Sequence, residues 1–159
     1  MHDEEFFNIK SNQFDNAIFF LERSGLDSPN ELQTLQSVYH NAVLYYVKNN
    51  NFSKARFYAS KSGKSDLTKY IDEREAFDFY EKGSLDKARQ AFQRLGNQQM
   101  VKAVYSKQYN VLYSRVAGLS NLATMRSHKS DYRKMLELAQ KMEDPKLTQD
   151  LRRILDQLQ

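Results

Sequence analysis

The residues that could perform acid–base chemistry in this chain are few and do not fall at catalytic spacings. Asp72, Glu73 and Glu75 are close in sequence, but neighbouring positions on a helix point to different faces. A pair of carboxyl groups that acts as general acid and general base needs perturbed pKa values and must converge on one substrate. We therefore expect no catalytic residue, and we predict that the protein is not an enzyme.

Histidine spacing and cysteine content argue against a metal site. The three histidines are His2, His40 and His128, and none lies three or four residues from another, the spacing that places two ligands on one helix face. The chain has no cysteine, so disulfides and thiolate ligands are excluded. We expect no metal and no cofactor.

One stretch has the composition of a phosphate-binding loop, Ser60-Lys61-Ser62-Gly63-Lys64-Ser65. The Walker motif needs a glycine five residues before its Gly-Lys-Ser, and that position is Tyr58. It also needs a preceding strand, whereas the local pattern is helical. We interpret Gly63 as a helix stop, followed by Ser65 or Thr68 as the cap of the next helix.

Tyr105, Tyr109 and Tyr113 recur every four residues, with cations nearby. Aromatic rings interleaved with cations can stack bases and hold phosphates. The same spacing is typical of core packing between helices, with basic groups extending outwards, and we favour that reading. The basic and aromatic face that this pattern predicts consists of Lys102, Lys107, Tyr109, Tyr113 and Arg115.

The formal net charge of +4 is unevenly distributed. Residues 1–50 carry 3 basic and 7 acidic groups, residues 51–101 carry 10 and 7, and residues 102–159 carry 11 and 6. Such a gradient can steer an acidic partner to the C-terminal half, although ordinary solvated helix faces produce it too. Binding of RNA or of another acidic surface by this half is therefore an alternative function, ranked below protein binding.

Composition indicates one globular helical domain. The chain has 159 residues, of which 40% are hydrophobic and 28% charged, with few glycines and prolines. Its acidic start, Met1 to Glu5, is unlike a secretory signal, and no apolar run approaches the roughly 20 residues of a membrane span. We expect a cytoplasmic protein without membrane contact.

Apolar residues recur at helical spacing along the whole chain, and no stretch alternates with the period of a strand. A capping box with proline, Ser28 to Glu31, is the clearest helix start. Ser11-Asn12 is expected to break the first helix, and Ser130 to cap a later one. The expected helices span residues 2–9, 13–24, 29–48, 52–62, 65–83, 85–95, 98–117, 119–126, 131–142 and 145–158.

The segment from Glu75 to Leu95 is expected to form a helical hairpin. Its two halves each carry an apolar stripe at helical spacing, and Gly83 and Ser84 lie between them as stop and cap. The stripes consist of Ala76, Phe79 and Tyr80, then Leu85, Ala88, Phe92 and Leu95. One hairpin cannot bury its apolar face alone, which predicts a stack of hairpins.

Three segments share a pattern whose alanines, Ala17, Ala55 and Ala88, lie 38 and then 33 residues apart. A helix-turn-helix unit with a period near 34 resembles the tetratricopeptide repeat (TPR) over roughly residues 12–96. The resemblance implies an all-α, right-handed superhelix of antiparallel hairpins, about eight to ten helices without strands. We expect one domain over residues 1–159, with degenerate repeats over 97–143 and a C-terminal capping helix over 144–159.

By this resemblance, the exposed residues of each first helix line a concave groove. Here they are His40, Leu44, Lys48, Tyr70, Glu73, Arg74, Phe77 and Tyr80. Their mixture of aromatic and apolar groups suits a peptide or helix of another protein, as in an adaptor, scaffold, chaperone or regulator. His40 and Leu44 replace the Lys and Asn that similar domains use to clamp the C-terminal carboxylate of heat-shock chaperones, which argues against that ligand.

Two further alternatives concern assembly. The last helix carries an apolar stripe, Leu147, Leu151, Ile154, Leu155 and Leu158, which can cap the stack or pair with a second copy. Pairing would make the chain a self-assembling structural subunit, a homo-oligomer joined through its C-terminal helix. The chain could also be the sensor half of a larger regulator.

Overall fold

The computed structural model describes the backbone of residues 2–23 and 29–159, and the side chains of residues 13–23 and 29–159. Within these ranges the chain is all-helical and contains no strand, which confirms the predicted all-α class. None of the helices in the described ranges combines the length and the apolar content needed to cross a membrane.

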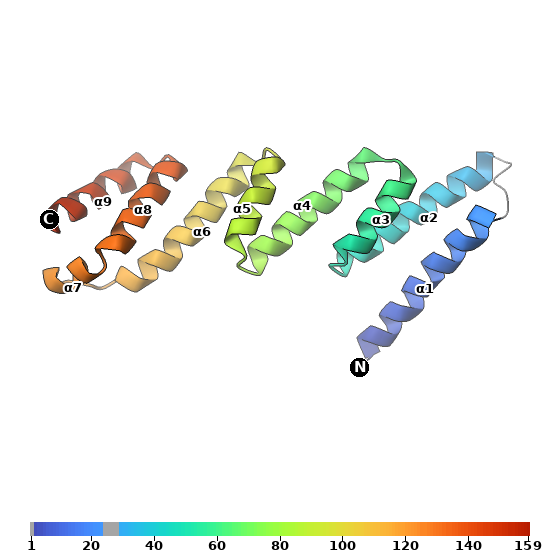
Figure 1. Ribbon diagram of the computed structural model, residues 1–159, viewed down its shortest axis with the longest axis horizontal. Helices are drawn as coiled ribbons and strands as arrows, with labels where there is room; N and C mark the ends of the chain where they lie inside the picture. The colour runs from blue at the N-terminus through green and yellow to red at the C-terminus, as the bar shows by residue number, and fades with distance from the viewer. Residues whose placement is uncertain (1, 24–28) are drawn as a thin grey trace. The chain divides into compact units, whose positions relative to one another are not determined.

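Nine helices follow one another over the described residues (Figure 1). They are α1 (His2–Arg23), α2 (Pro29–Lys48), α3 (Phe52–Ser62), α4 (Ser65–Glu81), α5 (Leu85–Arg94), α6 (Gln98–Val116), α7 (Leu122–Ser127), α8 (Lys129–Met142) and α9 (Pro145–Gln157). Most boundaries fall within a few residues of those expected from the apolar periodicity.

The expected break at Ser11-Asn12 is wrong, because α1 continues through it as one helix of 22 residues. Ser and Asn cost a helix at most about 0.7 kcal/mol each relative to Ala, which a continuing hydrogen-bond ladder offsets. The predicted helix end at residue 24 and the predicted cap at Ser28 lie outside the described residues.

Side-chain caps start several helices. Asn51 Oδ1 accepts a hydrogen bond from the amide of Lys54 at 3.2 Å, at the start of α3. The amide of Leu147 donates to Asp144 Oδ1 at 2.9 Å, and α9 starts at residue 145 as predicted. Each such bond satisfies an amide that has no partner within its own helix.

Two of the three predicted serine caps are wrong. Ser84 occupies the cap position of α5 as predicted, although its side chain makes no capping hydrogen bond. Ser65 is already the first residue of α4, and Ser130 lies inside α8, which starts after His128. Serine prefers the cap position, but its cost inside a helix is at most about 0.7 kcal/mol relative to Ala, so its presence alone does not fix the first residue.

The predicted stop at Gly83, and the turn expected between the helices over 29–48 and 52–62, are confirmed by backbone angles. Asn50 has φ of 55° and Gly83 has φ of 76°, both in the left-handed region that follows many helix ends. Asparagine and glycine adopt this region more readily than other residues do. These two positions therefore end α2 and α4.

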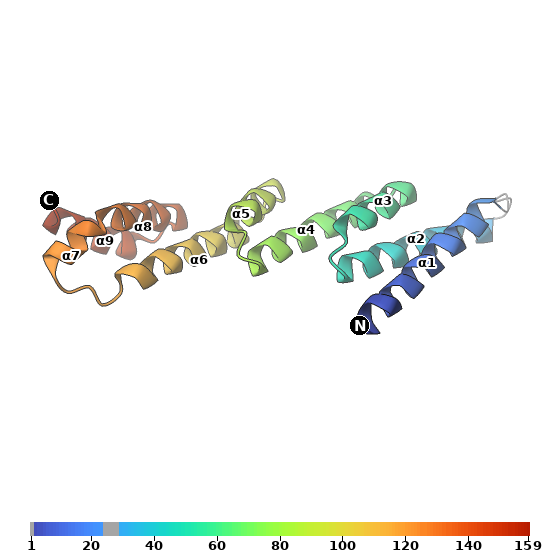
Figure 2. The same ribbon diagram turned by 60° about the horizontal axis from the view of Figure 1, so that its bottom comes forward.

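The chain divides into two compact units, Met1–Asp78 and Phe79–Gln159. In the first unit α2 packs against both α1 and α3 (Figures 1 and 2). Its core centres on the fully buried Ala42, Val43 and Tyr46 of α2 together with Ala55 of α3. The prediction of a single repeat domain over 1–159 stays a prediction.

In the second unit α6 packs against α5 and α8, and α9 packs against α8. Met135 and Ala139 of α8 are buried with Leu151 and Leu158 of α9. The remaining apolar residues of the last helix, Leu147, Ile154 and Leu155, pack against the same cluster. The apolar stripe of α9 thus covers α8 within its own unit.

Small residues lie where the repeat pattern expects close helix contacts. Ala55 and Ala88 are both fully buried, as is Ala76. The first alanine of the pattern, Ala17, is only half-buried, so a position facing the interior is confirmed for Ala55 and Ala88. The right-handed superhelix itself stays a prediction.

Candidate functional site

Two ion pairs join α1 to α3 in the first unit. Lys61 Nζ lies 2.8 Å from Glu22 Oε1, and Lys54 Nζ lies 3.7 Å from Asp15 Oδ2. Lys61 and Glu22 are 39 residues apart, and so are Lys54 and Asp15. Equal separations mean that the two helices run side by side in the same direction.

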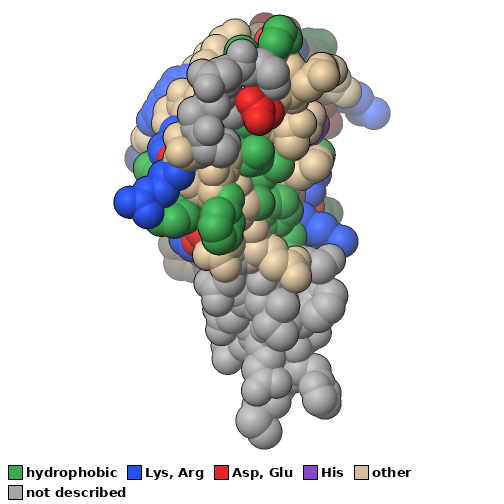
Figure 3. Space-filling model, turned by 90° about the vertical axis from the view of Figure 1, so that its right-hand side faces the viewer, with side chains coloured by type: hydrophobic (Ala, Val, Ile, Leu, Met, Phe, Trp, Pro, Cys, Tyr) green, Lys and Arg blue, Asp and Glu red, His purple; other side chains and the backbone are tan. Residues whose placement is uncertain are grey.

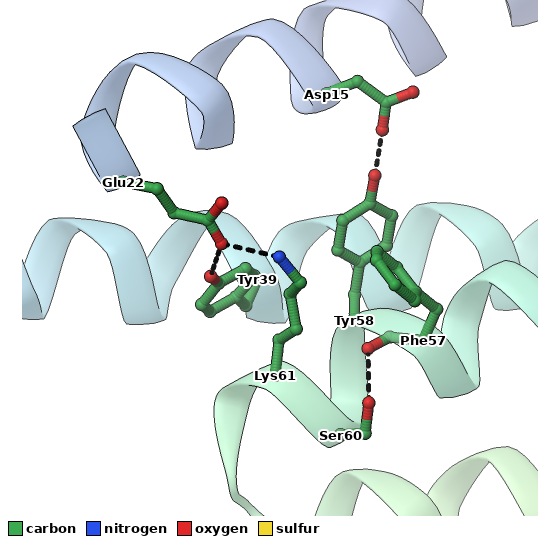
Figure 4. Close-up of polar contacts among 7 residues, drawn as sticks. All are labelled: Asp15, Glu22, Tyr39, Phe57, Tyr58, Ser60 and Lys61. Carbon is green, nitrogen blue, oxygen red and sulfur yellow. Dashed lines mark hydrogen bonds and ion pairs between the residues drawn. The ribbon is translucent and has the colours of Figure 1, made fainter.

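Two tyrosine hydroxyls reinforce this arrangement (Figure 4). Tyr39 of α2 donates to Glu22 Oε1 at 2.6 Å, and Tyr58 of α3 donates to Asp15 Oδ1. Both acceptors are carboxylates, so these are charge-assisted hydrogen bonds, which are stronger than neutral ones. They fix α1 over α2 and α3.

The electrostatics of the Glu22 cluster follow from these contacts. The hydrogen bonds from Lys61 and Tyr39 lower the pKa of Glu22. Burial, together with the neighbouring Glu22 carboxylate, raises the pKa of Tyr39 to about 12. Glu22 is therefore ionised and Tyr39 protonated at neutral pH, which are the states their hydrogen bond requires.

Between α1 and α3 lies a hollow of about 450 Å³. Ile18 and Tyr58 form its buried floor, whereas Phe19 and Phe57 on its walls are 50% and 53% exposed. The neighbouring Phe20 is 72% exposed and meets Phe19 edge-on. Figure 3, which views the end of the first unit where α1 lies, shows hydrophobic side chains gathered there with Lys and Arg on either side.

We call this hollow the α1–α3 groove; its lining residues are Asp15, Ile18, Phe19, Glu22, Lys54, Phe57, Tyr58 and Lys61. Cations lie over its exposed rings. Lys61 Nζ lies 5.3 Å from the centre of the Phe57 ring, and the Arg23 guanidinium carbon lies 4.7 Å from that of Phe19. The Phe57 ring also meets Tyr58 edge-on at 5.1 Å. Such contacts orient the rings but leave half of their surface open to a ligand. The α1–α3 groove offers apolar surface between charged edges, which is chemistry for binding.

The face predicted to line a groove is less apolar. Its α2 members are exposed, yet the hollow beside them, of about 510 Å³, is lined by polar residues and shares only His40 with the predicted set. The lining residues are Gln33, Gln36, Ser37, His40, Asn41 and Lys64. Leu44 and Phe77 are 39% and 36% exposed, less than the phenylalanines of the α1–α3 groove.

The other predicted groove residues differ in exposure and belong to both units. Lys48 and Arg74 are exposed, Glu73 is half-buried, and Tyr70 packs against the core of the first unit. Tyr80 belongs to the second unit. Its ring lies under Lys107, and its carbonyl accepts a hydrogen bond from Lys107 Nζ at 2.9 Å. The groove predicted from these residues stays a prediction.

The expectation that the carboxylates of α4 point to different faces is wrong for two of them. Arg56 Nη2 lies 2.6 Å from Asp72 Oδ1 and 2.7 Å from Glu75 Oε2. Residues three apart are neighbours on a helix surface, so one guanidinium reaches both. The Glu75 hydrogen bond is the main cause that raises the pKa of Arg56. This cluster is an ion-pair network that holds α4 to α3.

The described residues contain no group of three or more acidic or histidine side chains placed to hold a metal ion. His128 Nδ1 lies 3.1 Å from Asp131 Oδ2 at the start of α8. Asp72 and Glu75 face Arg56 as described above, so their charges are already offset.

The basic and aromatic face lies on α6, and its cations contact other groups of the protein. Lys102 Nζ lies 2.5 Å from Glu143 Oε2, and this contact lowers the pKa of Glu143. Arg115 lies 3.9 Å from Asp131, and Lys107 contacts α4 as described above. Tyr109 and Tyr113 stack with ring centres 6.1 Å apart; Tyr109 packs against the core of the second unit and Tyr113 is half-exposed.

Sequence reasoning missed the α1–α3 groove, although a signal for it was present. Phe19 and Phe57 each lie two residues after the alanine of their repeat, Ala17 and Ala55. Equivalent positions in successive repeats share one face of a solenoid, so two phenylalanines there predict a continuous aromatic surface. The third repeat has Gln90 at this position, which limits the surface to the first two.

Comparison with known proteins identifies no relative. No protein-family model matches the sequence, and no curated protein or solved structure matches it either. The resemblance to the tetratricopeptide repeat therefore rests on residue pattern alone.

Proposed function

We propose that this chain is a protein-interaction module, an adaptor or scaffold, that binds a peptide or helix of another protein in the α1–α3 groove. The observation that carries the proposal is the pair of half-exposed phenylalanines, Phe19 and Phe57, on either side of the 450 Å³ hollow. Exposed apolar patches with a polar rim are typical of protein-binding surfaces.

The energetics favour a partner at this place. Aromatic side chains at the centre of an interface commonly contribute more than about 2 kcal/mol each to binding. The ring orientations of Phe19 and Phe57 are already restricted by Arg23 and Lys61, so binding costs less side-chain entropy. The groove is therefore already formed before an apolar side chain of the partner binds in it.

The experiment compares captured partners of the full chain with those of the variant Phe19→Ser plus Phe57→Ser. Leu32→Ser is the matched control, because Leu32 is 51% exposed on α2 of the same unit and lies outside the groove. We expect the double variant to lose partners that the control keeps. If Leu44→Ser loses partners instead, the binding surface is the face of α2 and α4. If every variant captures the same partners, neither that face nor the α1–α3 groove is the binding surface.

Nucleic-acid binding is the second candidate, because Tyr113 stacks on Tyr109 and keeps half of its surface exposed. Its support is weaker, since Lys102, Lys107 and Arg115 already contact groups of the protein. Titration with single-stranded RNA at two salt concentrations tests it, because phosphate binding weakens steeply with salt. Affinity that does not depend on salt excludes this candidate.

A further inference from the structure

The two edges of the α1–α3 groove carry opposite charges at matched positions. Asp15 and Glu22 lie seven residues apart on α1, and Lys54 and Lys61 lie seven apart on α3. Seven residues are two helical turns, roughly 10.5 Å along the axis. The groove thus has two carboxylates on its α1 side and two ammonium groups on its α3 side, which meet across it in ion pairs, and the Arg23 guanidinium of α1 lies over Phe19.

These charged groups can make further contacts. Although they pair across the groove, their side chains stay between 36% and 46% exposed. Both contacts of Glu22, with Lys61 and with Tyr39, are made by Oε1, so Oε2 takes part in neither. A ligand lying in the groove would meet carboxylates along one side and ammonium groups along the other.

We propose that the partner segment is an amphipathic helix with a basic residue on the side that faces α1 and an acidic residue on the side that faces α3. Its apolar side chains, at helical spacing, lie between Phe19 and Phe57. This inference rests on the proposed function, and it adds the partner's conformation and charge pattern.

The shape of the groove supports a helix. A third helix laid along the furrow between two parallel helices is a common packing arrangement, and recognition of this kind uses apolar anchors at i, i+3, i+4 and i+7. Strand addition needs the open edge of a sheet, and the residues that the structure describes form no sheet. Opposite charges on the two edges favour one direction of the bound helix and disfavour the other.

The test selects peptides on the full chain from a displayed library. Each peptide has about 16 residues, roughly four helical turns, with apolar residues at helical spacing and all other positions random. We expect selected sequences to carry Lys or Arg along one side of the apolar stripe and Asp or Glu along the other. Selection of proline-rich or uniformly charged sequences would overturn the inference.

The selected peptide is then compared with a version in which its basic and acidic residues are exchanged. We expect affinity for the unchanged protein to fall about tenfold, as expected when two exposed pairs turn from attraction to repulsion. The variant with Asp15→Lys, Glu22→Lys, Lys54→Glu and Lys61→Glu keeps opposite charges across the groove and should prefer the exchanged peptide. If this variant fails to fold, the comparison of the two peptides on the unchanged protein still tests the charge pattern.

The outcomes separate this inference from the proposed function. Equal binding of both peptides, abolished by Phe19→Ser plus Phe57→Ser, would overturn the charge pattern and leave the proposed function standing. Binding that survives the loss of both phenylalanines would overturn the proposed function as well.

Discussion

Glu22 is the side chain that ties three helices of the first unit together. From α1 it accepts hydrogen bonds from Tyr39 of α2 and Lys61 of α3 on a single oxygen. A sequence reading cannot find this group, because its partners lie 17 and 39 residues away. An acidic residue near the end of a helix looks like any solvated surface residue.

Replacement of Glu22 by Gln should destabilise the protein at neutral pH by roughly 0.5–1 kcal/mol, since exposed charged contacts contribute modestly. Because native contacts lower the pKa of Glu22, its charge stabilises the fold above the ordinary carboxyl pKa. That stabilisation is lost as pH falls through the lowered native pKa. Urea denaturation of both proteins at neutral pH and at about pH 3 should show the difference shrinking in acid.

The control for this measurement is Glu137→Gln, because Glu137 is an exposed residue of α8 in the other unit. It should change the free energy of unfolding little at either pH. A Glu22→Gln effect of equal size at both pH values would show that the carboxylate charge does not contribute.

At the scale of the elements, sequence predicted the helices well because apolar periodicity and turn residues agree along most of the chain. The starts of α2 and α9 coincide with Pro29 and Pro145, and Gly83 ends a turn as expected. The failures fall on serine and on polar pairs inside helices, such as Ser130 and Ser11-Asn12. These residues differ too little in local preference to fix a boundary against the packing of the rest.

The helix caps give a direct comparison of two positions. Asp144→Ala should destabilise the protein by about 1 kcal/mol, because Asp144 caps α9 with a hydrogen bond to the amide of Leu147. Ser84→Ala should change stability by only a few tenths of that, since Ser84 makes no capping bond. Chemical denaturation measures both, and equal effects would contradict the assigned caps.

Close helix packing at Ala88 leaves no room for a larger side chain. Ala88→Leu should destabilise the protein by about 1–3 kcal/mol, because Ala88 is fully buried. Ala123→Leu is the control, since Ala123 is exposed on α7 and should tolerate the change. Thermal unfolding compares the two, and a neutral Ala88→Leu would show that the alanine is not at a close contact.

At the scale of the whole molecule, the repeat pattern predicted an all-helical chain, which is confirmed over the described residues, and buried alanines, which are confirmed at Ala55 and Ala88. It did not predict which face opens into a groove, because that depends on how α1 lies on α3. The contacts that set this, such as Asp15 with Tyr58 and Glu22 with Lys61, are separated by about one repeat. The resemblance to the tetratricopeptide repeat predicted a groove lined by α2 and α4, whereas the more exposed aromatic residues are Phe19 of α1 and Phe57 of α3.

Each unit has its own apolar cluster, so a core mutation should act mainly within its unit. Met135→Ala in α8 removes a fully buried side chain and should cost about 2–5 kcal/mol. Hydrogen exchange should then accelerate in α6, α8 and α9 much more than in α2 and α3. Equal acceleration in both units would mean that they unfold as one.

The central claim is that the α1–α3 groove is the binding surface of this protein. Amide chemical-shift mapping of the full chain, titrated with a peptide selected on it, tests this claim most directly. We predict that the shifts gather at residues 15–22 of α1 and 54–61 of α3 and disappear when Phe19 and Phe57 are replaced by Ser. Shifts gathered instead around His40 and Leu44, or on α6 and α8, would contradict the account.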